Sequence, residues 1–178
     1  MRVLITGTGR CGTTTCFHAA SCISNYTVGQ ESIFGTSRSA LLRFSGGHIE
    51  ISPPLHIAVA ALKARYQDLC LVHLVREREA CARSVARLRN GDGGHVIDVW
   101  ARSYCGWNDE QRLDVARYYV DCVNATIAAN HPDVTIHLER PLAPWERLWR
   151  MIGARGNLPE SLDQWNHHRN TAEERGEA

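Results

Sequence analysis

The chain has 178 residues, a length typical of one domain. Apolar residues make up 44% and charged residues 22%, which is ordinary for a folded globular protein and argues against a disordered chain. Lys and Arg together number 20 and Asp and Glu 19, so the formal net charge is +1. This balance excludes a broadly electrostatic nucleic-acid binder, and we expect no nucleic-acid partner.

The basic residues are almost all arginines, because Lys63 is the sole lysine. A biased genome composition would explain this, but arginine also suits bidentate recognition of phosphate or sulfate. No stretch of 18 apolar residues occurs, so we expect no membrane-spanning helix and no membrane partner. The residues after Met1 are typical of a strand and a loop rather than of the apolar segment of a signal peptide.

The seven cysteines are irregularly spaced and include no C-x-x-C pair. An odd number without regular spacing is typical of free thiols in a reduced compartment, so we expect a cytoplasmic protein. The pattern also lacks the paired spacing of a zinc site, and we expect no metal.

The chain begins with a short apolar run over residues 2–6, whose β-branched side chains predict a buried first strand. The glycine-rich residues 7–12 predict a loop, and residues 13 to about 21 continue as a helix. A second short strand is predicted over residues 26–28. Residues 35–52 are rich in Gly and Ser and favour no single element.

Residues 53–66 fit a helix with prolines in its first turn. The nearly continuous apolar run over residues 70–75 is typical of a strand buried on both faces of a parallel sheet. A helix over residues 77–89 follows. Asp109 is a candidate cap for a long helix that ends near Asn130.

The remaining chain predicts a strand over residues 134–138, a helix over residues 144–151, and a polar, disordered tail over residues 171–178. Strands and helices alternate along residues 1–170, which predicts a single α/β domain. Its mostly parallel central sheet would be flanked by helices in three layers. In such folds ligands bind at the carboxyl ends of strands, so the loops after the first strand and after the buried strand are the candidate ligand loops.

The loop after the first strand combines strand, glycines and helix in the order that builds an anion cradle. Against the Walker pattern G-x-x-x-x-G-K-[ST], Gly7, Gly12 and Thr14 match, whereas Thr13 stands at the lysine position. The loop has a cation at Arg10 instead. Such a loop is poorly equipped for the β- and γ-phosphates of ATP, but its N–H groups, hydroxyls and arginine can hold a phosphate.

The segment Gly9-Arg10-Cys11-Gly12-Thr13-Thr14 resembles the G-R-S-G-T-T loop of sulfotransferases that use 3′-phosphoadenosine 5′-phosphosulfate (PAPS). The resemblance implies a three-layer P-loop-like fold in which this loop embraces the 5′-phosphosulfate. The cofactor-binding residues it implies here are Gly9, Arg10, Cys11, Gly12, Thr13, Thr14 and Thr15. Cys11 departs from the usual serine, which removes a hydroxyl but keeps the backbone N–H.

The loop after the buried strand carries a second resemblance. The segment from His73 to Ser84 is similar to the family's strand–R-D-P-R–helix segment, in which an arginine and a later serine bind the 3′-phosphate. Arg76 and Ser84 match in type, order and spacing. Glu77 and Arg78 stand where the family has Asp and Pro. The strand ends on a cation rather than on the acid that often holds magnesium in ATP-dependent enzymes.

Sulfuryl transfer needs a group that accepts the proton of the attacking acceptor. Residues 28–32 resemble the G-E-E segment that carries the base in protein-tyrosine sulfotransferases and similar bacterial enzymes, which implies Glu31 as the base. His48, Glu50 and His56 are alternatives. Arg10 is the second expected catalytic residue, because it would stabilise negative charge on the bridging oxygen.

The C-terminal part is similar to the strand and helix that complete compact bacterial sulfotransferases. Its helix carries Trp145 and Trp149 at helical spacing, and we expect both in the core. Residues 153–156 hint at the family's late glycine-and-basic cofactor loop. Residues 165–170 weakly resemble its closing motif.

The sequence therefore predicts a cytoplasmic sulfotransferase that moves the sulfuryl group of PAPS to a hydroxyl or amine of an unidentified acceptor. The first alternative is a nucleotide-dependent small-molecule kinase with an unorthodox P-loop, which would need Mg²⁺ and ATP. The second is a catalytically inactive nucleotide-binding protein. The sequence leaves the oligomeric state open.

Overall fold

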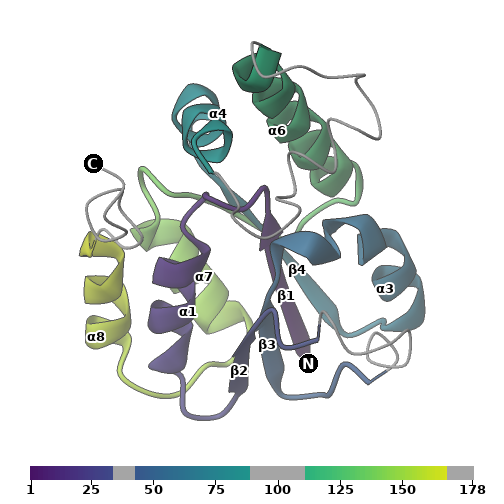
Figure 1. Cartoon of the computed structure of the whole chain (residues 1–178). Coiled ribbons are helices and arrows are strands. Elements are labelled where there is room, and N and C mark those ends of the chain that lie inside the picture. The colour runs from purple at the N-terminus through teal and green to yellow at the C-terminus, as the bar shows by residue number, and fades with distance from the viewer. Residues whose placement is uncertain (34–42, 89–110, 168–178) are drawn as a thin grey trace.

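The computed structural model describes residues 1–33, 43–88 and 111–167 (Figure 1). The predicted α/β class is confirmed, because five strands form one sheet in the order β2-β3-β1-β4-β5 and each neighbouring pair is parallel. The strands are β1 (Arg2–Gly7), β2 (Thr27–Gln30), β3 (His48–Ile51), β4 (Leu69–Val75) and β5 (Val134–His137).

Strand β3 lies within residues 35–52, for which the sequence predicts no single element. It pairs with β1 on one side and with β2 on the other. Ile49 and Ile51 pack into one core, while Glu50 points to the opposite face. The strand alternates polar and apolar residues over only four positions, directly after a glycine-rich turn, and a period-two pattern this short is a weak signal.

The helices are α1 (Thr13–Ser21), α3 (Val59–Arg65), α4 (Arg78–Ala86), α6 (Arg112–Ala129), α7 (Leu142–Met151) and α8 (Leu158–Asp163), with 3-10 segments η1 (Pro53–Ala58) and η3 (Gln164–Asn166). The helix predicted over residues 53–66 is therefore two segments, and its two prolines begin the 3-10 part. The sequence does not predict α8 and η3. Asp109 and the predicted tail over residues 171–178 lie outside the described residues.

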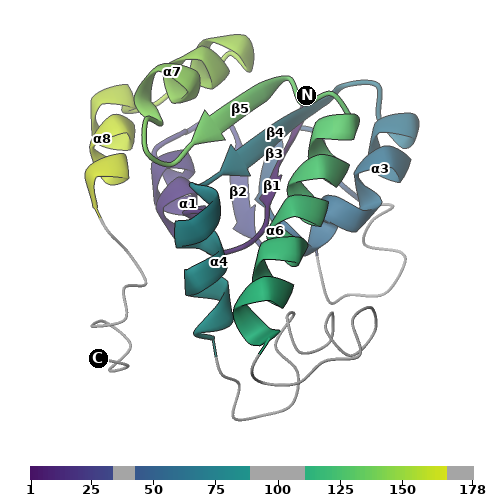
Figure 2. The same ribbon diagram turned by 90° about the horizontal axis from the view of Figure 1, so that it is seen from above.

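Helices cover both faces of the sheet, which gives three layers (Figure 2). Helices α1, α7 and α8 lie on one face, and η1, α3, α4 and α6 lie on the other. Trp145 and Trp149 are buried in the first core, at 1% and 7% exposure, as the sequence predicts. Within the described ranges, no helix is both long and apolar enough to cross a membrane.

The central strand β1 sets the position of the candidate ligand loops. The chain leaves β1 toward α1 on one face, whereas it leaves the adjacent β4 toward α4 on the other (Figure 1). The two strands end side by side, with Gly7 paired to Leu74. Ligands of parallel α/β sheets bind where neighbouring connections diverge in this way. We call this side of the sheet, where its strands end, the carboxyl edge.

Candidate functional site

Residues 8–12, between β1 and α1, form a loop with a left-handed backbone at several positions. The φ angle is 71° at Gly9, 53° at Arg10 and 96° at Gly12. Gly12 is the N-cap of α1 and provides no side-chain cap. The first N–H groups of a helix have no partner within the helix, so those of α1 can donate to an oxyanion together with the N–H groups of the loop.

Two guanidinium contacts join this loop to the segment after β4. Arg76 Nη1 donates to the carbonyl oxygen of Arg10 at 3.1 Å. Arg10 Nε donates to Ser84 Oγ at 3.2 Å, across 74 residues of sequence. Three residues from two separate sequence motifs therefore lie together at the carboxyl edge.

The charges of both arginines act on the pKa of the Cys81 thiol in α4. Burial raises the pKa of Cys81, the hydrogen bond with Thr8 and then the nearby charges of Arg76 and Arg10 act against this rise, and Glu139 adds to it. Both cations thus lie close enough to influence the same thiol. Their proximity makes the surroundings of the loop favourable for an anion.

Helix α6 supports the loop through a residue outside both motifs. Tyr119 Oη donates to the carbonyl oxygen of Thr8 at 2.9 Å, and the Thr8 hydroxyl donates to the carbonyl oxygen of Gly9 at 2.9 Å. Burial raises the pKa of Tyr119, so its hydroxyl remains protonated and continues to donate. The sequence contains no signal for this role, because Tyr119 simply occupies the apolar side of a long helix.

The remaining loop residues differ in what they offer a ligand. Cys11 is fully buried in the core and its pKa is raised by burial to about 12, so only its backbone borders the loop. Thr13 and Thr14 are half-buried at the N-terminus of α1. Thr15 is buried and its hydroxyl donates to the carbonyl oxygen of His167 at 3.4 Å. Thr15 can therefore serve an anion through its N–H, while its side chain faces the C-terminal segment.

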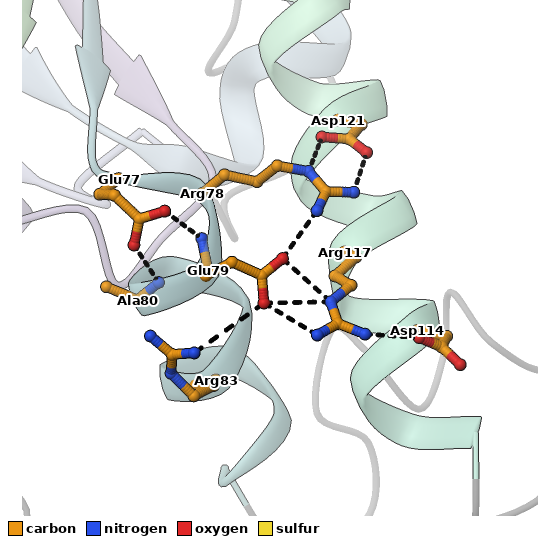
Figure 3. A network of polar contacts seen from close by, with 8 residues as sticks. All are labelled: Glu77, Arg78, Glu79, Ala80, Arg83, Asp114, Arg117 and Asp121. Atoms are coloured by element: carbon orange, nitrogen blue, oxygen red, sulfur yellow. Dashed lines mark hydrogen bonds and ion pairs between the residues drawn. The ribbon is translucent and has the colours of Figure 1, made fainter.

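The N-terminus of α4 differs from that of α1 because a side chain caps it. The Glu77 carboxylate accepts hydrogen bonds from the backbone N–H groups of Glu79 and Ala80 at 2.8 and 2.6 Å (Figure 3). These bonds lower the pKa of Glu77. Glu77 thus provides a carboxylate cap for α4, and an anion is expected at α1 rather than at α4.

A group of ion pairs fixes α4 against α6 (Figure 3). Glu79 accepts from Arg117 through both carboxylate oxygens at 2.9 to 3.1 Å, and from Arg78 at 2.7 Å. Arg78 also pairs with both oxygens of Asp121 at 2.7 and 2.6 Å. Because Ser84 stands on α4, these pairs contribute to its position beside Arg10.

Two of the candidate bases, Glu31 and His56, follow strands at the carboxyl edge. Glu31 comes directly after β2, is exposed, and donates its N–H to the carbonyl oxygen of Ile51 at 3.0 Å. Strand β3 separates β2 from β1, so Glu31 lies about 10 Å to the side of the β1 end.

His56 lies in η1, which follows β3. Its Nδ1 is 2.8 Å from the carbonyl oxygen of Pro53, which can only accept, so Nδ1 carries the proton. Burial lowers the pKa of His56, which favours the neutral ring with Nε2 as the proton acceptor. Pro53 itself lies beside Gly9 of the loop.

His48 and Glu50 lie away from the loop. His48 begins β3 opposite Arg2, at the amino edge of the sheet. Glu50 is fully buried. Neither side chain is placed to take a proton from an acceptor at the carboxyl edge, so Glu31 and His56 are the two candidates that the geometry favours.

Residues 153–156, whose sequence weakly resembles a glycine-and-basic cofactor loop, lie near the C-terminal end of α1. The carbonyl oxygen of Arg155 accepts from the Ser24 N–H at 2.7 Å, and the Arg155 N–H donates to Asn25 Oδ1 at 2.7 Å. These contacts tie the segment to the connection between α1 and β2. The segment therefore does not border Gly12.

The C-terminal segment also holds α1 directly. Ser161 Oγ accepts from Trp145 Nε1 at 2.8 Å and donates to the carbonyl oxygen of Ala19 at 2.7 Å. The Trp165 ring packs edge-on against Trp145, with centroids 5.4 Å apart. The helix whose N-terminus completes the anion loop is thus anchored by residues near the other end of the chain.

A search against models of known protein families finds none that matches this chain, and a search of curated proteins finds no significant match. In residues 1–33, 43–88 and 111–167, no group of three or more His, Cys, Asp or Glu side chains is arranged to hold a metal ion.

Proposed function

We propose that this chain is a PAPS-dependent sulfotransferase that acts on a hydroxyl or amine of an acceptor. The observation that carries the proposal is the meeting of Arg10, Arg76 and Ser84 at the carboxyl edge, through contacts of 3.1 and 3.2 Å. A donor with two separate anionic groups needs two cationic sites at a fixed spacing. The ends of two adjacent strands supply a cation each.

The residues present fit such a donor. The N–H groups of residues 9–15 and the hydroxyls of Thr13 and Thr14 would hold the 5′-phosphosulfate. Arg76 and Ser84 would hold the 3′-phosphate, which distinguishes PAPS from ATP. The Arg76 contact with the loop uses one of the five guanidinium N–H groups, so the same residue can bind an anion as well.

The backbone of Arg10 supports a role for its side chain. Its φ of 53° is left-handed, which costs a residue other than glycine about 1–2 kcal/mol. Glycine would avoid that cost, so a cation retained there suggests that the loop needs the charge. When bound, PAPS would supply the sulfuryl group, and Arg10 would stabilise the charge that develops on the leaving phosphate.

Glu31 would take the proton that the acceptor loses, with His56 as the alternative base. Both residues follow strands on the side of β1 that is away from β4. The acceptor would therefore lie over β3 and the donor over β1 and β4. A cytoplasmic location is part of the proposal, and the six described cysteines, which are all free thiols, support it.

Thermal unfolding with 3′,5′-ADP, ADP and Mg-ATP tests the proposal without knowledge of the acceptor. We expect 3′,5′-ADP to stabilise the protein most, by about 2.7 kcal/mol at a hundred times its Kd. Labelled PAPS with a panel of phenols, sugars and aminoglycosides would then reveal transfer. Equal stabilisation by ADP, or a larger effect of Mg-ATP, would contradict the proposal and favour a kinase.

A catalytically inactive nucleotide-binding protein is the second candidate. The position of residues 153–156 favours it, because this segment is docked on Ser24 and Asn25 instead of bordering the anion loop. Stabilisation by 3′,5′-ADP with no transfer to any acceptor of the panel would support this candidate.

A further inference from the structure

Glu50 is a carboxylate buried inside the domain. It is 0% exposed and pairs in register with Leu4 of the central strand, a position where apolar residues are usual. Ser32 Oγ donates to its Oε2 at 2.5 Å and the Ile33 N–H donates to its Oε1 at 3.3 Å. His48 Nε2 lies 3.1 Å from Oε2. A buried carboxylate is tolerated only with such partners.

Two of these partners come from the turn that follows β2. Residues 31–33 leave the strand at the carboxyl edge, and the second and third of them bind the Glu50 carboxylate. The first, Glu31, is the proposed base. Glu50 is thus linked to Glu31 through one short stretch of backbone.

Glu31 has a backbone conformation that is unusual for glutamate, with φ at 52°. Among the residues that the structure describes, Arg10 and His131 are the other non-glycine residues with positive φ. His131 follows α6, where a left-handed residue commonly ends a helix. Glu31 has no such local reason, so the contacts around its turn must maintain the conformation.

Gly29 provides the space for this arrangement. A Cβ atom there would lie 2.2 Å from Ser32 Oγ and 2.8 Å from Glu50 Oε2. The φ of Gly29 is outside the left-handed region, so alanine fits the backbone and acts only by displacing these two side chains.

We propose that Glu50 is a positioning residue whose buried carboxylate holds the turn of residues 31–33 and so fixes Glu31 for proton transfer. The inference rests on the proposed function, because it takes Glu31 as the base. Glu50 itself does not meet the substrate, since no part of it is exposed.

Glutamine can replace Glu50 without leaving a polar group unpaired. Its amide oxygen would accept from the Ile33 N–H, and its NH₂ group would donate to Ser32 Oγ and His48 Nε2. His48 would then carry its proton on Nδ1, which lies 2.8 Å from Thr27 Oγ1 and would donate to it. Leucine offers none of these bonds. Glu50→Gln and Glu50→Leu both remove the charge, but only Glu50→Leu should release the turn.

Amide hydrogen exchange, measured residue by residue in the full chain, tests the turn independently of activity. We expect the Ile33 N–H to exchange about tenfold faster or more in Glu50→Leu and Gly29→Ala, and at the wild-type rate in Glu50→Gln. Ser21→Ala is the control, because it removes a serine hydrogen bond that lies away from the turn, to the carbonyl oxygen of Phe17 at 2.8 Å. It should leave Ile33 exchange unchanged.

Turnover with PAPS and an acceptor tests the consequence for Glu31. We expect kcat to fall on the order of 10²-fold in Glu50→Leu and Gly29→Ala and to be retained in Glu50→Gln. The affinity for 3′,5′-ADP should stay unchanged in all three, because Arg10, Arg76 and Ser84 are untouched. A general loss of structure would lower both quantities together.

Wild-type Ile33 exchange in a folded Glu50→Leu variant would overturn the inference. Faster exchange with unchanged kcat would overturn it as well, and so would equal damage from Glu50→Gln and Glu50→Leu. If Glu50→Leu does not fold, Gly29→Ala and Ser32→Ala decide by the same criteria. Absence of transfer by the wild-type chain would overturn the proposed function together with the inference, so the two failures are distinguishable.

Discussion

Replacing Arg76 by alanine should separate the two phosphate sites. Arg76 directly follows strand β4 and also donates to the carbonyl oxygen of Arg10 at 3.1 Å. Arg76→Ala therefore removes two interactions. One is the proposed bond to the 3′-phosphate, and the other supports the loop that holds the 5′-phosphate.

The two losses have different sizes. A hydrogen bond between a guanidinium and a phosphate contributes roughly 1.5–3 kcal/mol, which corresponds to about ten- to a hundredfold in affinity. The contact with the Arg10 carbonyl contributes about 1 kcal/mol, or roughly fivefold. We expect 5′-AMP, which lacks a 3′-phosphate, to lose only the smaller factor, and 3′,5′-ADP to lose both.

Isothermal titration of the two nucleotides against wild type and Arg76→Ala measures this difference. Arg83→Ala is a suitable control, because Arg83 is an exposed arginine on the next helix whose ion pair with Glu79 spans 3.9 Å. It should leave both affinities unchanged. An equal loss for 5′-AMP and 3′,5′-ADP in Arg76→Ala would refute the assignment of Arg76 to the 3′-phosphate.

Three further changes test other parts of the site. Arg10→Ala should lower the single-turnover rate more than the affinity for PAPS, because the charge matters most as the leaving phosphate becomes negative; a pure affinity defect in calorimetry would contradict this. Glu31→Gln should keep 3′,5′-ADP binding and lower kcat by about 10²–10⁴-fold, and near-normal turnover would make His56 the next residue to replace. His56 has its pKa lowered by burial, so the folded state favours the neutral ring and its contribution to stability is lost as pH falls below about 6.5. In denaturant titrations between about pH 5 and 7, His56→Gln should therefore lose stability less steeply than wild type on acidification, and identical slopes would show that His56 does not contribute.

The central strands can be predicted well from the sequence, because a strand that is buried on both faces consists almost entirely of apolar residues. In β4, Cys70, Val72 and Leu74 face one core while Leu69 and Leu71 face the other, so the strand is apolar except at the buried His73. The side-by-side ends of parallel strands then account for the closeness of Arg10 and Arg76, since both residues follow such ends.

Strand β3 could not be predicted in the same way. Glu50 is as deeply buried as the isoleucines beside it, and the hydrogen bonds that permit this come from Ser32, Ile33 and His48. None of these partners is evident from the local pattern, because their approach depends on the pairing of β2 with β3.

The directions of the side chains around the loop could not be predicted from the sequence either. Thr15 lies in the same helical turn as Thr13 and Thr14, yet its hydroxyl meets the carbonyl oxygen of His167. Tyr119 reaches Thr8 across 111 residues. Such contacts follow from helix packing, which short motifs do not encode.

The Ser161 contact with Ala19 has a consequence for the order in which the protein is assembled on the ribosome. Synthesis delivers β1, the anion loop and α1 first, whereas Ser161 and its helix emerge last. Until then α1 lacks both the hydrogen bond from Ser161 to Ala19 and the packing of Trp165 in the core that they share. The loop that is synthesised first should thus be among the last parts to reach its final geometry. A chain that stops at Met151 should retain every residue of both phosphate motifs and still fail to bind 3′,5′-ADP.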